Sequence, residues 1–196
     1  MIELVVASAL LAVVLTTVLS IWHMMNRTSA AQQADREGRQ VARTALDFLS
    51  SEVQTADLIW TGTNTVNGHV YHVPAPSVSG TDLLYASPED GTTWRVSGVY
   101  LAPMNDSTNP GAQEIVVEQF AGVTPVRPGE PASIDLQSLT TPHVRTFLAF
   151  LPAGNWLTVS SPPRGVGFDM TFFRVVPHGP VESEHLVANA VMRDGL

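Results

Sequence analysis

The side chains that most often do chemistry in proteins are sparse and scattered in this chain. It has six histidines and no cysteine, and no serine, histidine or aspartate falls in a nucleophile motif. His69 and His72 are three residues apart in a stretch with strand character, so their side chains point to opposite faces and cannot share one metal ion. His143, His178 and His185 lie near prolines or strand starts. We therefore expect no catalytic residue, no metal site, no cofactor and no enzyme activity.

Two short segments resemble ligand-binding loops but lack the required spacing. Residues 105–109, Asn-Asp-Ser-Thr-Asn, offer hard oxygen ligands suited to calcium, yet the terminal glutamate of an EF-hand is missing. Residues 164–167, Arg-Gly-Val-Gly, lack the further glycine and the helix of a phosphate-binding loop. The first segment is predicted to be a surface turn, and the second lies in the turn-rich connector from Ser160 to Gly167.

Glu3 is the acid that needs an explanation, because it stands beside the apolar run from Leu4 to Trp22. That run has no charged residue, glycine or proline, and about 20 apolar residues suffice to cross a bilayer. It predicts a transmembrane helix. A carboxylate beside such a run usually has a paired function. Glu3 is either an exposed acid favoured by the positive end of the helix dipole or the partner of a cation on a neighbouring copy.

Helical periodicity continues beyond the apolar run, to about Asp57. From Ser29 onward, apolar residues recur every three or four positions, which is the pattern of an amphipathic helix. Only Gly38 weakens it, by about 1 kcal/mol relative to alanine. We predict one continuous helix whose second half packs on the rest of the chain through Val41, Leu46, Phe48, Leu49 and Val53.

After Asp57 the composition shifts toward threonine, valine, glycine and proline, and strands are predicted. The pair Asn67-Gly68 favours a tight hairpin turn, and the run from Ser87 to Gly91 is a second turn. The predicted strands are Asp82 to Ala86, Thr93 to Leu101, Glu114 to Phe120, Val144 to Leu151, Trp156 to Val159, Phe168 to Val176 and His185 to Met192, with a further start at Leu58 to Thr61. The predicted fold class is α+β: a long N-terminal helix, transmembrane in its first half and amphipathic in its second, packed against one antiparallel sheet.

Length and charge limit the function further. The 196 residues divide into a helix of 1–26 for the membrane or a filament core, an amphipathic half of 27–57, and a β-rich head of 58–196. The formal net charge is −8, and all ten basic residues are arginines without clustering. This pattern gives no indication of nucleic-acid binding.

The N-terminal residues Ile2-Glu3-Leu4-Val5-Val6-Ala7 and the amphipathic half that follows resemble the first helix of type IV pilins and type II secretion pseudopilins. Residues 45–56, Ala-Leu-Asp-Phe-Leu-Ser-Ser-Glu-Val-Gln-Thr-Ala, are similar to the end of that helix in minor pilins of the PilW type and pseudopilins of the PulJ type. The family normally has a short basic leader before the Ile-Glu pair, so we expect one either upstream of Met1 or removed. The end of the family's head also extends further, so Leu196 is expected to fall short of a complete head.

The resemblance implies a structural subunit of a type IV pilus or type II secretion pseudopilus. Its partners would be other pilin or pseudopilin subunits, the lipid bilayer and the inner-membrane assembly platform. It would be a single-pass protein of the bacterial inner membrane with an extracytoplasmic head, later incorporated into the filament. Glu3 would set register by compensating the N-terminal amine of an adjacent subunit, and Ala7, Ser8, Ala9 and Ala12 would allow close helix packing.

The sequence is compatible with two other functions. The first is a single-span, membrane-anchored binding module whose β-rich head recognises a ligand while the helix only tethers it. The second is a secreted enzyme released by cleavage after the apolar run, which the length of the run and its missing basic start argue against.

Overall fold

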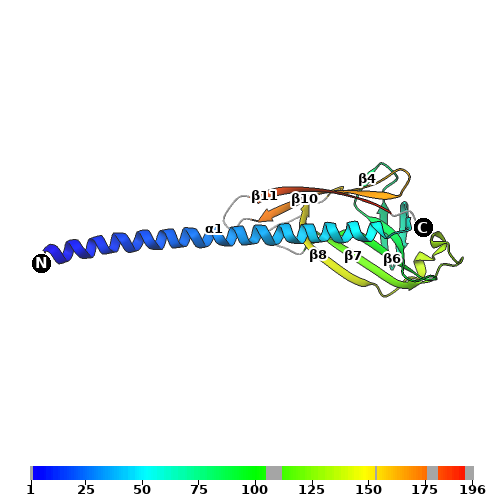
Figure 1. The fold of residues 1–196 in the computed structure, drawn as a ribbon, viewed down its shortest axis with the longest axis horizontal. Helices are drawn as coiled ribbons and strands as arrows, with labels where there is room; N and C mark the ends of the chain where they lie inside the picture. The colour runs from blue at the N-terminus through cyan, green and yellow to red at the C-terminus, as the bar shows by residue number, and fades with distance from the viewer. Residues whose placement is uncertain (1, 105–111, 153, 176–180, 193–196) are drawn as a thin grey trace.

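The computed structural model describes residues 2–104, 112–152, 154–175 and 181–192. One helix, α1 (Ile2–Gln54), extends from the head as a rod, and its last turns lie inside the head (Figure 1). The strands are β1 (Leu58–Ile59), β2 (Gly62–Val66), β3 (His69–Val73), β4 (Ser79–Gly80), β5 (Leu83–Pro88), β6 (Trp94–Pro103), β7 (Ala112–Val123), β8 (His143–Pro152), β9 (Leu157–Val159), β10 (Gly165–Val175) and β11 (Val181–Val191). Two short 3₁₀ helices, η1 (Pro131–Ser133) and η2 (Leu136–Ser138), lie between β7 and β8.

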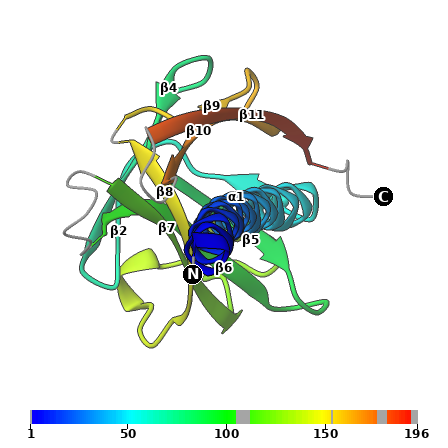
Figure 2. The ribbon, with the colours of Figure 1, turned by 90° about the vertical axis from the view of Figure 1, so that its left-hand side faces the viewer.

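The strands form two antiparallel sheets and one hairpin. The first sheet has the order β1-β5-β6-β7-β8, the second has the order β11-β10-β9-β4, and β2 pairs with β3. Viewed along the rod, α1 lies between β10 and β11 on one side and β5 and β6 on the other (Figure 2). The amphipathic end of the helix is therefore covered by sheet on two sides.

The C-terminal end of α1 passes directly into the first sheet. The backbone amides of Thr55 and Ala56 donate to the carbonyls of Glu52 and Val53, which tightens the last turn. The amide of Asp57 then donates to the carbonyl of Ala86 on β5. Only the three residues 55–57 separate the helix from β1.

The β2–β3 hairpin forms at the predicted turn. Asn67 and Gly68 both have positive φ, 48° and 79°, as a two-residue type I′ turn requires. The hairpin packs on the first sheet at Gly98, where a Cβ would lie 2.4 Å from Cζ of Tyr71. Successive side chains along a strand point to opposite faces of the sheet. Val99, the next residue along β6, pairs with Leu83 and Val117 within the core, so Gly98 points to the other face. The hairpin therefore covers the face of the sheet that points away from α1.

The predicted fold class was wrong. In place of one sheet packed on a half-transmembrane helix, the described residues are mostly antiparallel β-structure in two sheets and a hairpin. Among the described residues, no helix is both long enough and apolar enough to cross a membrane. The single sheet was wrong because β9 and β10 pair with β4 and β11 and not with β8, a choice that the local sequence pattern does not determine.

Candidate interaction surface

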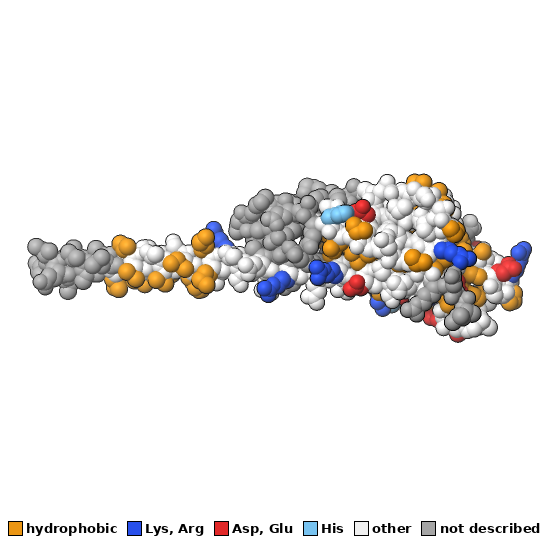
Figure 3. Space-filling model, turned by 45° about the horizontal axis from the view of Figure 1, so that its top comes forward, with side chains coloured by type: hydrophobic (Ala, Val, Ile, Leu, Met, Phe, Trp, Pro, Cys, Tyr) orange, Lys and Arg blue, Asp and Glu red, His pale blue; other side chains and the backbone are white. Residues whose placement is uncertain are grey.

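The rod exposes large apolar side chains that nothing in the described chain covers. Leu11, Val14, Leu19 and Trp22 are 63%, 58%, 54% and 58% exposed. The same holds for the other large apolar residues described between positions 11 and 25, namely Val13, Leu15, Val18, Ile21, Met24 and Met25. They form a band of apolar side chains on the rod outside the head (Figure 3). Covering one such side chain contributes roughly 1.5–3 kcal/mol, and an apolar area of this size on a protein surface indicates an interaction site.

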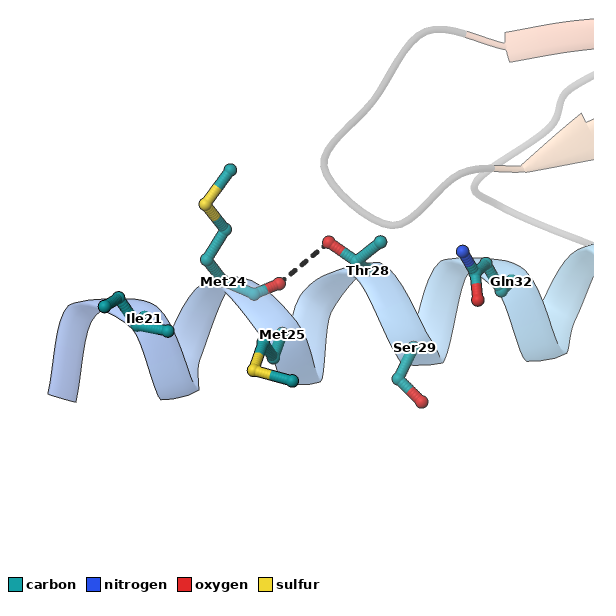
Figure 4. Close-up of a pocket in the computed structure, with 6 residues that line it drawn as sticks. All are labelled: Ile21, Met24, Met25, Thr28, Ser29 and Gln32. Atoms are coloured by element: carbon teal, nitrogen blue, oxygen red, sulfur yellow. Dashed lines mark hydrogen bonds between the residues drawn. The ribbon is translucent and has the colours of Figure 1, made fainter. Parts of the chain in front are cut away.

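Several hydroxyl groups on the rod are bonded to the helix itself. The Thr17 hydroxyl donates to the carbonyl of Val13 at 2.7 Å, and the Thr28 hydroxyl donates to the carbonyl of Met24 at 2.9 Å. The second bond borders a surface groove of about 400 Å³ lined by Ile21, Met24 and Met25 (Figure 4). Because these hydroxyls are already paired, they add little cost when the rod is buried against an apolar partner.

The opposite end of α1 is fixed in the head by buried aliphatic residues. Leu46, Leu49 and Val53 are at most 6% exposed, and Phe48 packs against the same core at partial exposure. Val41 is 36% exposed, so it lies at the margin of the contact. The Phe48 ring meets Phe147 of β8, with centroids 5.4 Å apart, and the Arg145 guanidinium lies 5.1 Å from its centroid.

Glu52 is the polar anchor between α1 and the first sheet. Its carboxylate accepts a hydrogen bond from the Gln119 amide at 3.1 Å and one from the Tyr85 hydroxyl at 3.5 Å, and Arg95 lies 3.6 Å away. These partners come from β7, β5 and β6. Burial, followed by the Glu52 charge, raises the pKa of Tyr85 far above its usual value. One acid thus joins the helix to three strands, although the sequence does not distinguish Glu52 from the other polar residues of the amphipathic half.

A second polar cluster lies under the hairpin. The Glu118 carboxylate, 9% exposed, accepts hydrogen bonds from the hydroxyls of Tyr71 at 2.9 Å and Tyr100 at 3.3 Å. The His69 ring stacks on Tyr100 with centroids 3.9 Å apart. Burial and the neighbouring Glu118 charge raise the pKa of Tyr100 to about 12, and the same causes raise the pKa of Tyr71 further. The rings contact one another, so the cluster holds the hairpin on the sheet.

The other residues singled out from the sequence take the following positions. The side chains of Glu3, Ala7, Ser8, Ala9 and Ala12 and the whole segment 105–109 lie outside the described residues. His72 is exposed on β3, and His185 contacts Asp169 on the outer face of the second sheet, a pair that sequence spacing did not indicate. Within the described residues, no group of three or more metal-binding side chains lies together.

The chain was compared with protein-family models, curated proteins and solved structures. No family model, no curated protein and no solved structure matches it. The exposed rod and the residues of the chain itself therefore carry the evidence for function.

Proposed function

We propose that the chain is a structural subunit, a minor pilin or pseudopilin, that assembles through its N-terminal helix into a type IV pilus or type II secretion pseudopilus. Before assembly it is held at the bacterial inner membrane with its head on the extracytoplasmic side. Its partners are other subunits of the filament and the inner-membrane assembly platform. Its activity is assembly and involves no catalysis.

One observation carries this proposal: a helix of 53 residues is fixed in the head at one end and exposes large apolar side chains at the other. Such a rod needs an apolar environment on its free part, and the helices of neighbouring subunits supply one. The buried contacts of Leu46, Leu49 and Val53 keep the head on the rod while the free part packs with its neighbours. The resemblance of residues 2–7 and 45–56 to pilins and pseudopilins supports a filament of this kind.

The contacts within the filament follow from the chemistry of the rod. Exchange of one apolar environment for another supplies little driving force, so association depends on close packing and on polar pairs. The paired hydroxyls of Thr17 and Thr28 lower the cost of burial. Glu3 is proposed to set the register between subunits, and Ala7 and Ala12 to allow close approach.

An aspartate placed on the rod tests the proposal. We expect Val18→Asp to place a charge among the packed helices. The amount of the chain recovered in the sheared, sedimented filament fraction is expected to fall about tenfold or more. The matched control is Val126→Asp, because Val126 is 75% exposed on the head. Immunoblots of the filament and cell fractions measure both. Equal recovery of the two variants in the filament fraction would contradict the assembly role.

A membrane-anchored binding module is the alternative, and a helix exchange separates the two functions. Replacement of Met1 to Asn26 by an unrelated apolar helix leaves a tether functional, because the head is still anchored. The same exchange abolishes recovery in filaments if the rod makes specific contacts. Retained incorporation after the exchange would favour the alternative.

A further inference from the structure

The strand β11 leaves a long edge of the second sheet without a partner strand in the described part of the chain. It lies at the end of the strand order β11-β10-β9-β4, and its 11 residues pair with β10 without a register shift. The strand at the opposite edge, β4, has only 2 residues. Proteins usually protect an open edge with a short strand, a bulge, a proline or a charge. Residues 186–191 have none of these, so the edge is open to pairing with another strand.

The direction of the backbone groups shows which residues of β11 are free to pair. The Met192 amide donates to the carbonyl of Arg164 at 2.8 Å, on the side of β10. In an antiparallel ladder both backbone groups of a residue point to the same side, and successive residues alternate. The amides and carbonyls of Val187, Asn189 and Val191 therefore point away from β10, to the free edge. Their side chains lie on the outer face of the sheet, where the two valines are 61% and 67% exposed.

The residues along this edge have the same character when read in either direction. Residues 186–192 are Leu-Val-Ala-Asn-Ala-Val-Met, with Asn189 at the centre. An antiparallel partner of the same sequence, centred on Asn189, places Val187 opposite Val191, alanine opposite alanine and leucine opposite methionine. Asn189 meets its own copy, and an amide carries both a donor and an acceptor for such a contact. Centring the pair on Ala188 would instead place asparagine opposite valine.

We propose that the free edge of β11 is the docking site for β11 of a second copy of this chain, paired antiparallel about Asn189. This register brings the outward-pointing backbone groups of the two copies together, and each pair of such residues exchanges two hydrogen bonds. The exposed valines of the two copies cover one another across the outer face. Residues 186–192 carry no charged side chain, so no like charges meet along this contact.

The pairing also determines how the two rods point. Figure 1 shows β11 running mainly along the direction of α1. An antiparallel pair of strands reverses direction, so the rods of the two copies point opposite ways. Subunits joined head to tail in one filament point the same way. If the proposed function holds, the second copy therefore belongs to another filament, and the edge joins filaments through their heads. The pairing of the strands does not itself depend on that function.

Disulfide formation tests the pairing, because the chain has no native cysteine. Residues directly opposite in a strand pair lie within disulfide reach, so we expect Asn189→Cys to give a linked dimer when the detergent-solubilised full chain is mildly oxidised. The matched control is Asp169→Cys, at an exposed position on β10 beside Val187. The control is expected to give about tenfold less dimer, because a whole strand separates it from the edge. Equal yields from the two variants would overturn the pairing.

A mixture of Val187→Cys and Val191→Cys tests the register. The two positions face each other between copies, so we expect the mixture to give the mixed dimer. Each variant alone places its two cysteines about 14 Å apart, which is too far for a disulfide. Self-linked dimers as abundant as the mixed dimer would overturn the centre at Asn189.

Charged pairs at the same positions provide a test by rescue, with Asn189→Cys dimer yield as the readout. Val187→Lys/Val191→Lys places lysine opposite lysine, and we expect the yield to fall about tenfold. Val187→Lys/Val191→Glu places opposite charges together and is expected to keep the yield within about twofold of the parent. Both valines are exposed, so melting temperatures of the two variants are expected to match. Equal yields from them would contradict the pairing.

Filament recovery separates this inference from the proposed function. We expect Val187→Lys/Val191→Lys to enter filaments as the wild type does, whereas Val18→Asp does not. Loss of Val18→Asp from filaments, together with no Asn189→Cys dimer, would refute the edge pairing and leave the proposed function standing. Normal recovery of Val18→Asp with an abundant Asn189→Cys dimer would refute the proposed function and leave the pairing standing.

Discussion

Gly98→Ala is the substitution whose effect follows most directly from the structure. A Cβ at this position would lie 2.3 Å from the hydroxyl oxygen and 2.4 Å from Cζ of Tyr71, well inside van der Waals contact. Tyr71 is fully buried and cannot move into solvent without displacing the hairpin. The added methyl therefore strains the packing and pulls the Tyr71 hydroxyl from the Glu118 carboxylate.

The magnitude can be worked from these two contacts. Overpacking costs about 1–3 kcal/mol, and a hydrogen bond to a charged group contributes about 1.5–3 kcal/mol. We expect the free energy of unfolding to fall by roughly 3 kcal/mol and the Tm by about 10 °C for a chain of this size. Thermal unfolding of the detergent-solubilised full chain, followed by near-ultraviolet circular dichroism, measures the change.

The matched control for this substitution is Gly91→Ala. No atom lies within 4 Å of a Cβ built at Gly91, so the control is expected to change stability by less than about 0.5 kcal/mol. A second variant, Tyr71→Ala, removes the clashing ring, so adding Gly98→Ala to it is expected to cost far less than in the wild type. Full additivity of the two substitutions, or equal Tm values for Gly98→Ala and Gly91→Ala, would refute the reasoning.

Two further predictions concern the polar groups of the head. The chain has three tyrosines, and the pKa of Tyr100 is raised to about 12 while those of Tyr71 and Tyr85 are raised further, so absorbance at 295 nm is expected to show no phenolate at pH 10 in the folded protein. The tyrosines have higher pKa values in the folded than in the unfolded chain, so their stabilising effect is complete below pH 10 and is lost as the pH rises above it. Ionisation of the tyrosines near pH 10 in the folded protein, before it unfolds, would contradict this prediction. Glu52→Gln leaves Arg95 without its carboxylate and is expected to lower the free energy of unfolding, measured by urea titration, by about 2 kcal/mol. The control Asp47→Asn, at an exposed position, is expected to change it little. Equal stability of the two variants would count against Glu52 as the anchor.

The sequence predicted local structure better than it predicted the assembly of the sheets. The hairpin at Asn67-Gly68 was confirmed, because positive φ at both positions is a local property of those two residues. The predicted strands from Asp82 to Val159 overlap β5 to β9, because period-two alternation and turn residues are also local. The two-residue strand β4 was not predicted, since nothing in Ser79-Gly80 alternates.

What the sequence could not supply was pairing between distant segments. The single predicted sheet was wrong because β9 and β10 pair with β4 and β11 and not with β8, a choice set by tertiary packing. The Glu52 anchor and the Glu118 cluster join residues 33 to 67 positions apart and 18 to 47 positions apart, so no local spacing reveals them. For the interaction surface, the apolar run was evident from the sequence. Which of its side chains the head leaves uncovered could be learned only from the structure.

The anchoring of α1 between two sheets also has a mechanical consequence. Sheet covers the end of the helix on two sides, and Glu52 ties it to three strands at once. A pull along the axis of the rod therefore loads many contacts in parallel, as in shear, and does not open them one after another as in peeling. A head attached in this way resists extraction from its own stalk under tension far better than its modest number of polar bonds would indicate.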